Sequence, residues 1–140
     1  MQRLTFRRDF DLPPEQVFPY FAEHENLGPM LGAKVTRLSD GDDSSRNGVG
    51  SCRRLQVGPA PAFEETITAC EPDLLIDYRI TKGSPLKHHL GELRFTPVGS
   101  GTHLEWRISF TTTVPGLDRL LAEILKRRIS QGLAQADPSS

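Results

Sequence analysis

The segment Gly101–Gln135, GTHLEWRISFTTTVPGLDRLLAEILKRRISQGLAQ, predicts a strand with one buried face, followed by a long amphipathic helix. Four apolar residues alternate with polar ones in the strand: Leu104, Trp106, Ile108 and Phe110. Six aliphatic residues recur at helical spacing in the helix, which is expected from about residue 116: Leu117, Leu120, Leu121, Ile124, Leu125 and Ile129. Each surface needs an apolar partner, so we expect the helix to lie on the inner face of a sheet that contains this strand.

The N-terminal part of the chain predicts one strand and two short helical segments. Apolar and polar residues mostly alternate over residues 4–10, which is typical of a strand with one buried face. The run Pro13–Glu15 opens a helix, because proline is tolerated in the first turn and an early acid suits the helix dipole. Pro19 should bend this helix or keep it short. Glycine and proline within residues 25–32 predict a second short helix or turn, followed by a strand over 35–38.

The middle of the chain predicts a meander of strands. Residues 39–50, SDGDDSSRNGVG, form a polar run that is expected to be a mobile surface loop. Beyond it, turns rich in glycine and proline separate segments with strand patterns, over residues 49–57, 62–70, 74–81, 88–97 and 102–113. Consecutive strands without helices between them favour antiparallel pairing.

The predicted fold class is therefore α+β. We expect a curved antiparallel sheet of about seven strands around a long C-terminal helix, with two short helices after the first strand. Residues 1–136 are expected to form a single domain, and residues 137–140 a frayed tail.

This order of elements, together with several short motifs, resembles the START-like superfamily, also called SRPBCC or Bet v 1-like. The likeness is greatest to its polyketide cyclase/dehydrase branch. It is carried by LPPEQVF at Leu12–Phe18, by GVGSCR at Gly48–Arg53, and by the later strand segments Glu71–Arg79 and Gly101–Trp106. The resemblance covers nearly the whole chain.

The resemblance implies a helix-grip fold with a cavity between the sheet, the short helices and the long helix. Across the superfamily such cavities hold lipids, sterols, polyketides, plant hormones and similar molecules, so the fold does not select one ligand. The expected partner is a hydrophobic or amphipathic small molecule.

The composition is that of a water-soluble globular protein, with a mean hydropathy of -0.40. The 17 basic and 18 acidic residues give a formal net charge of -1, so no overall field attracts nucleic acid, and no nucleic-acid partner is expected. No run approaches the ~20 apolar residues that span a bilayer, so no integral membrane association is expected. We expect a monomer or a homodimer.

The cysteines and the N-terminus predict the compartment. Cys52 and Cys70 have no metal-binding spacing and the strand parity of outward residues, so they are expected to be inert free thiols without a metal. The first residues lack the apolar core of a signal peptide. We therefore expect a cytoplasmic protein, and no cofactor motif is present.

Arg53 and Glu65 are the first candidate site residues. Arg53 has the strand parity of Val49, and Glu65 has the parity of Phe63. Both lie six residues from Pro59, so a hairpin centred there would place them opposite each other on the inner face. Such a pair could orient a polar ligand head. The alternative, which the sequence favours slightly, is a pair near the sheet edge, or a bulge that turns one charge outward.

Tyr78 and His89 are a second candidate pair, because strand parity places both in the same interior. A histidine there could move a proton near neutral pH, and a tyrosine could polarise a carbonyl group. The more common alternative is that each is a core residue with one satisfied hydrogen bond.

Arg128 and four aromatic residues complete the expected pocket. Arg128 lies on the apolar stripe of the C-terminal helix and could reach an acidic ligand group; alternatively, its stem packs on the core while its head reaches water. The aromatic residues expected in the pocket wall, although such residues are often simply core, are Phe63, Phe95, Trp106 and Phe110.

The sequence contains no phosphate loop, nucleophile elbow or paired-cysteine motif. The leading hypothesis is therefore binding of a lipid- or polyketide-like molecule in an internal cavity. The second is a cyclase, dehydratase or related lyase in which Arg53, Glu65, Tyr78 or His89 supplies acid–base help. The third is a protein-interaction module of the same fold. Because these three hypotheses remain, the sequence does not decide whether the protein is an enzyme.

Overall fold

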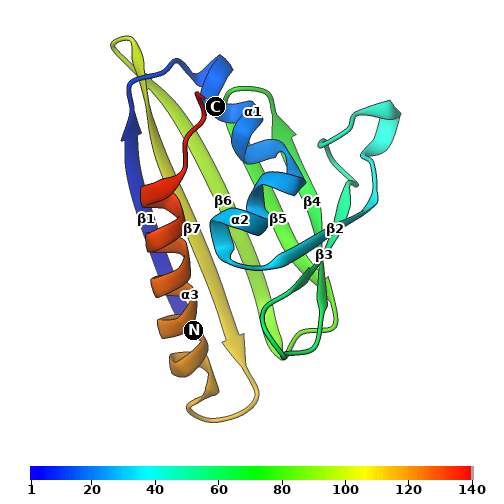
Figure 1. Cartoon of the computed structure of the whole chain (residues 1–140). Helices are drawn as coiled ribbons and strands as arrows, with labels where there is room; N and C mark the ends of the chain where they lie inside the picture. Colours follow the sequence, from blue (N-terminus) through cyan, green and yellow to red (C-terminus); the bar gives the residue numbers. More distant parts are fainter. Residues whose placement is uncertain (140) are drawn as a thin grey trace.

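The computed structural model describes residues 1–139, in which helices cover the inner face of one curved antiparallel sheet (Figure 1). The strands lie in the order β1-β7-β6-β5-β4-β3-β2. They are β1 (Gln2–Phe10), β2 (Lys34–Ser39), β3 (Cys52–Gln56), β4 (Phe63–Glu71), β5 (Leu75–Lys82), β6 (Leu86–Val98) and β7 (Gly101–Thr112). The helices are α1 (Pro14–Ala22), α2 (Leu27–Leu31) and α3 (Leu117–Gln135), with 3₁₀ turns η1 (His24–Asn26) and η2 (Asp42–Ser44).

The α+β helix-grip fold predicted from the sequence is confirmed by this arrangement. Ser140, the last residue of the expected tail, lies outside the described residues. None of the helices within residues 1–139 is long and apolar enough to cross a membrane.

The core lies on the concave face of the sheet. On α1, Phe18 packs edge-on against Phe95 of β6, with ring centroids 5.2 Å apart, and Phe21 lies 6.5 Å from the ring of Trp106. These contacts hold α1 against the inner face of β6 and β7. The inner residues of β7 are at most 3% exposed, as their alternation predicts: Leu104, Trp106, Ile108 and Phe110.

The orientation of α3 differs from the predicted one. Leu120 and Ile124, expected on the buried stripe, are 59% and 42% exposed. The helix buries Ile129 as predicted, but its other buried residues are Ala122, Gly132 and Leu133, because α3 approaches α2 closely at Gly132. A Cβ atom at Gly132 would lie 2.0 Å from the carbonyl oxygen of Met30, so only glycine allows this packing, which fixes the rotation of α3.

Two predictions of strand parity are wrong. The third strand begins at Cys52, not at residue 49, and Val49 is 41% exposed in a turn that also contains Gly50 at φ 91°. In β4, a bulge between Ile67 and Ala69 reverses the alternation, so Cys70 pairs with buried Ile76 and packs against the core.

Substitution of two isoleucines on α3 tests its orientation. Ile129 is 2% exposed, so Ile129→Ala should lower the free energy of unfolding by about 2–5 kcal/mol through lost burial and a cavity. Ile124→Ala makes the same chemical change at an exposed position and should alter it by no more than about 0.5 kcal/mol. Urea unfolding monitored by circular dichroism measures both. Equal losses would contradict the orientation described.

Candidate functional site

A small cavity lies between α2, α3 and strands β3 to β7. Its volume is about 80 Å³, room for two or three water molecules at roughly 30 Å³ each. The wall is mostly aliphatic and aromatic, with polar groups from β3 to β6. It is formed by Leu27, Leu31, Arg53, Leu55, Val57, Phe63, Glu65, Tyr78, Ile80, Leu86, His89, Trp106, Ile108, Leu125 and Arg128.

Seven of the nine residues predicted to form a pocket lie around this cavity, and two do not. Phe95 lies under α1 against the rings of Phe18 and Phe21. Phe110 is fully buried in the core and does not line the cavity. Both share the strand parity of cavity residues, but they lie at other positions along their strands. Parity selects a face of the sheet and does not select a place along it.

Arg53 and Glu65 face each other across β3 and β4 on the inner face. They are register partners, and Nε and Nη2 of Arg53 lie 3.0 and 2.9 Å from Oε1 of Glu65. The residues are only 4% and 8% exposed. The interior pair is therefore the interpretation that the structure supports, and the edge or bulge alternative is wrong for this hairpin.

Tyr78 forms part of the cavity wall next to this ion pair. Its hydroxyl oxygen accepts a hydrogen bond from Nε1 of Trp106 at 3.0 Å, and the guanidinium carbon of Arg53 lies 5.2 Å from its ring centre. Burial, and then the nearby Glu65 carboxylate, raise the pKa of the Tyr78 phenol above its ordinary value. Tyr78 therefore stays protonated and remains a hydrogen-bond donor.

Gly91 makes the position of the Tyr78 ring possible. The two residues pair across β5 and β6, and a Cβ atom at Gly91 would lie 2.1 Å from Cζ of Tyr78. Sequence analysis did not assign Gly91 a role. An isolated glycine inside a strand is itself a signal of close approach by a neighbouring group.

His89 is held as a neutral imidazole at the cavity wall. Its Nδ1 accepts a hydrogen bond from the backbone N–H of Ile80 at 3.0 Å, so the neutral ring carries its proton on Nε2. Burial is the main cause that lowers the pKa of His89. A bulge at positive-φ His88 lies beside it in β6. His89 therefore offers the cavity a donor.

The polar groups around the cavity have spare hydrogen-bonding capacity. Within residues 1–139, no protein group bonds to Nη1 of Arg53, Oε2 of Glu65 or Nε2 of His89. The hydroxyl proton of Tyr78 likewise has no acceptor among these residues. The site thus combines several donors with one carboxylate acceptor. No group of three or more His, Cys, Asp or Glu side chains in the described residues could hold a metal ion.

Arg128 joins α3 to α2 beside the cavity. Its Nη1 donates to the carbonyl oxygens of Leu31 and Gly32 at 3.0 and 3.2 Å. These are carbonyls at the C-terminal end of α2, where a cation is favourable. The Arg128 head therefore caps α2, a role that the sequence did not predict, and its contact with an acidic ligand group stays a prediction.

A second polar cluster lies behind the pair, at η1. His24 is fully buried, and its Nε2 lies 3.2 Å from Oγ of Ser51, which itself donates to the carbonyl of Gly48. The Ser51 oxygen is thus the acceptor, and Nδ1 of His24 keeps an unpaired lone pair. Burial, followed by the field of Arg53, lowers the pKa of His24 to about 3.

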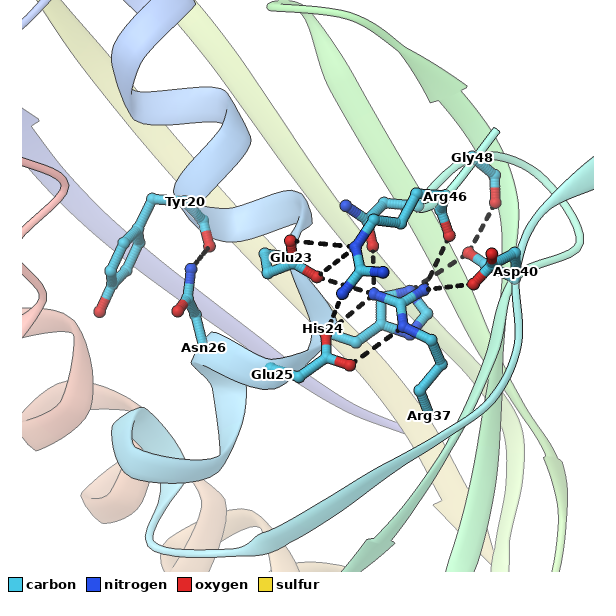
Figure 2. A network of polar contacts seen from close by, with 11 residues as sticks. Tyr20, Glu23, His24, Glu25, Asn26, Arg37, Asp40, Arg46 and Gly48 are labelled. Carbon is cyan, nitrogen blue, oxygen red and sulfur yellow. Dashed lines mark hydrogen bonds and ion pairs between the residues drawn. The ribbon is translucent and has the colours of Figure 1, made fainter. Parts of the chain in front are cut away.

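Arg37 of β2 forms ion pairs with three carboxylates around it, those of Glu23, Glu25 and Asp40 (Figure 2). It bonds both oxygens of Glu25, at 3.0 and 2.8 Å, and Oε1 of Glu23 at 2.8 Å. It also donates to the carbonyl of Arg46 and to Asn47, which ties the segment after η2 to η1. Sequence analysis expected this segment to be a mobile loop and missed its anchor.

The curved antiparallel sheet and the helices that cover its inner face define a helix-grip fold. A family model described as "Polyketide cyclase / dehydrase and lipid transport" matches residues 1–137, and the chain belongs to this family. This confirms the resemblance noted in the sequence. No curated protein matches the chain.

Several solved structures share this fold. The aromatase/cyclase ZhuI from a Streptomyces species aligns with a TM-score of 0.76 and 19% identity, covering 96% of this chain and 92% of that one. A Thermus thermophilus protein aligns at 0.75 and 19%, covering 95% and 92%. Norcoclaurine synthase from Thalictrum flavum, crystallised with a transition-state analogue, aligns at 0.73 and 12%, covering 96% and 90%. At these identities the likeness shows the fold alone.

A double-mutant cycle tests the burial of the ion pair. Arg53→Met and Glu65→Leu each leave one buried charge without its partner, and each should lower the free energy of unfolding by about 3–5 kcal/mol. The double variant has no charge to bury and should be more stable than either single variant. Urea unfolding measures all four proteins.

The control pair for this cycle is Arg7 and Glu105, which bond at 3.0 Å where Arg7 is 61% exposed. Arg7→Met and Glu105→Leu should show coupling of only about 0–1 kcal/mol. Coupling no larger at Arg53 and Glu65 than at this control would place the pair in solvent.

His24 predicts a loss of stability in acid. Its pKa is about 3 in the folded chain against 6.5 as the ordinary value, so the unfolded chain takes up the proton first. The contribution of His24 to the free energy of unfolding is complete above pH 6.5 and falls as the pH decreases toward 3. The pKa of Glu25, lowered to about 2 by Arg37, adds a loss of the same sign below pH 4.5.

Replacement of His24 by glutamine should therefore reduce the pH dependence between about pH 6.5 and 5.5, where Glu25 is mostly ionised in both states. Urea unfolding midpoints across this window provide the measurement. An unchanged slope in His24→Gln would show that His24 is not buried as a neutral ring.

Proposed function

We propose that residues 1–136 act as one binding domain for a mainly apolar small molecule of the polyketide- or lipid-like class. The polar end of the ligand lies against Arg53 and Glu65, and its apolar body lies among the aliphatic residues of the cavity. The observation that carries this proposal is the burial of an ion pair at the wall of an otherwise apolar cavity. Such a pair costs desolvation and is poor evidence for stability, so a role in recognition accounts for it.

The polar groups favour a particular ligand chemistry. Glu65 neutralises Arg53, and Arg128, the other cation of the cavity wall, directs Nη1 to the carbonyl oxygens of Leu31 and Gly32. Tyr78 and His89 offer neutral donors, which suit a carbonyl or hydroxyl oxygen. The unbonded Oε2 of Glu65 suits a ligand hydroxyl group. A ketone or hydroxyketone on an apolar skeleton therefore fits better than a fatty acid.

Ligand entry requires the cavity to expand. Sites for drug-sized molecules have volumes of about 300–1,000 Å³, whereas this cavity has about 80 Å³. On the sheet side, strand pairing holds the cavity wall in place. On the helix side, the wall is held by the packing of Leu27, Leu31 and Leu125 and by the hydrogen bonds of Arg128 to α2. Movement of α2 away from α3 is therefore the route to a larger volume.

The second candidate function is a cyclase or dehydratase of the same pocket. The observation in its favour is that a protonated phenol, Tyr78, and a carboxylate, Glu65, line one cavity. Tyr78 would donate to a substrate carbonyl, and Glu65 would accept a proton from a neighbouring carbon or hydroxyl. Two structural neighbours carry enzyme names, an aromatase/cyclase and a norcoclaurine synthase, which makes this candidate worth testing. Loss of water from the compound, or an isomer with the same mass and a different chromatographic retention, would distinguish it from binding alone.

Trp106 provides the test of binding, because it is the single tryptophan of the chain and lines the cavity. Acetylnaphthalene should quench its emission, and ethylnaphthalene, of similar size but without a carbonyl, should bind about fivefold to tenfold more weakly, the worth of about one hydrogen bond. The double variant Arg53→Met, Glu65→Leu should reduce this preference. If neither compound quenches Trp106, the binding proposal fails.

A further inference from the structure

The outer edge of β1 is a long, regular strand edge. β1 pairs with β7 from Gln2 to Phe10 without a bulge, and it is the last strand on its side of the sheet. Among residues 1–139, no backbone group outside β7 bonds to the backbone of Gln2–Asp9. Such an edge leaves alternate N–H and C=O groups free to pair with another extended chain.

Two adjoining grooves, of about 690 and 550 Å³, follow this edge between β1 and α3. Both are lined by Thr5, Phe6 and Ser130, so they form one continuous channel. On the β1 side the wall consists of consecutive residues, 2–6 in one groove and 5–8 in the other. Alternate side chains of a strand point to opposite faces, so a wall of consecutive residues includes the backbone edge itself.

The dimensions of the channel match a short extended peptide. Residues 2–8 of β1 extend over about 20 Å at ~3.3 Å per residue. The α3 wall, from Arg119 to Ala134, is of similar length at ~1.5 Å per residue. In Figure 1, α3 runs alongside β1 over most of the strand. A segment of about six residues therefore fits between them.

The channel is basic although the whole chain carries a net charge of -1. Glu123 is the one carboxylate among the residues that line it. Arg8 already donates to the carbonyl oxygens of Leu133 and Ala136, and Arg7 already forms an ion pair with Glu105. The other cations of the channel have no carboxylate partner in residues 1–139: Arg3, Arg119 and Lys126.

We infer that this channel binds an extended acidic peptide segment of a partner protein, which pairs with β1 as an additional strand. Backbone pairing supplies the affinity, and Arg3, Arg119 and Lys126 select acidic side chains. A nucleic acid would meet the charges but could not match the alternating backbone groups. A second copy of this chain is disfavoured, because antiparallel pairing of two β1 edges about Thr5 would oppose Arg3 with Arg7 of the other copy.

A fluorescent heptapeptide with paired residues, Glu-Glu-Val-Val-Glu-Glu-Val, places glutamates on both faces of an added strand and tests the inference with the full chain. Its anisotropy should rise on binding, and amide exchange in β1 should slow. The same peptide with alternate backbone nitrogens methylated keeps its charge but loses half its donors, so it should bind at least about tenfold more weakly. Absence of binding by the unmodified peptide overturns the inference, and so does equal binding of the two peptides.

Charge reversal locates the binding site. The double variant Arg3→Glu, Lys126→Glu should weaken peptide binding about tenfold or more at low salt. The matched control Lys34→Glu, Arg127→Glu makes the same change in net charge on β2 and on another face of α3, and should change binding less than about twofold. Thermal melts confirm that all variants fold. Equal weakening by both variants overturns the inference, as does a concentration-dependent dimer that excludes the peptide.

Discussion

The cavity exists because the concave face of the sheet extends beyond the area that α3 covers. α3 packs on β1 and β7, α1 packs on β6 and β7, and short α2 bridges α3 and β2 (Figure 1). Within residues 1–139, α2 and side chains from the edge of α3 lie over the inner face of β3 to β5 at the cavity. Polar residues can occur on this part of the face, because no long helix packs against it. The placement of the helices thus determines where a ligand can bind.

The polar residues behind the cavity depend on one another through their charges. Arg53 neutralises Glu65 and, with Arg37, contributes to keeping His24 uncharged. Arg37 in turn is balanced by Glu23 and Glu25, which lie at the end of α1 and in η1. Loss of Arg53 would leave Glu65 without its partner, whereas loss of Arg37 would leave Glu23 and Glu25 with Arg46 alone. This interdependence links the segment after η2 to the cavity wall through Ser51 and His24.

Local patterns predicted the fold well and the site in part. Equal spacing about Pro59 brought Arg53 and Glu65 together, because a hairpin without a bulge preserves register. The same reasoning was wrong at Cys70, because a bulge in β4 is not visible in the sequence pattern. The exposure of Leu120 and Ile124 follows from the contact of Gly132 with α2, which links distant parts of the chain. Strand parity and helical spacing describe one element at a time, whereas the place of a residue along a cavity depends on several elements.

The contrast between Tyr78 and His89 shows what the chemistry of the cavity can and cannot do. His89 is neutral, and the lone pair on its Nδ1 accepts a hydrogen bond from the amide of Ile80. His89 therefore cannot take a proton from a ligand at Nδ1 without losing that bond. Tyr78 is protonated and sits where it does only because Gly91 has no side chain. Among the described side chains that line the cavity, the carboxylate acceptor is Glu65, and its Oε1 is already held by Arg53. A pocket with several donors and one carboxylate that is already held by an ion pair has the groups needed to orient an oxygen-bearing ligand.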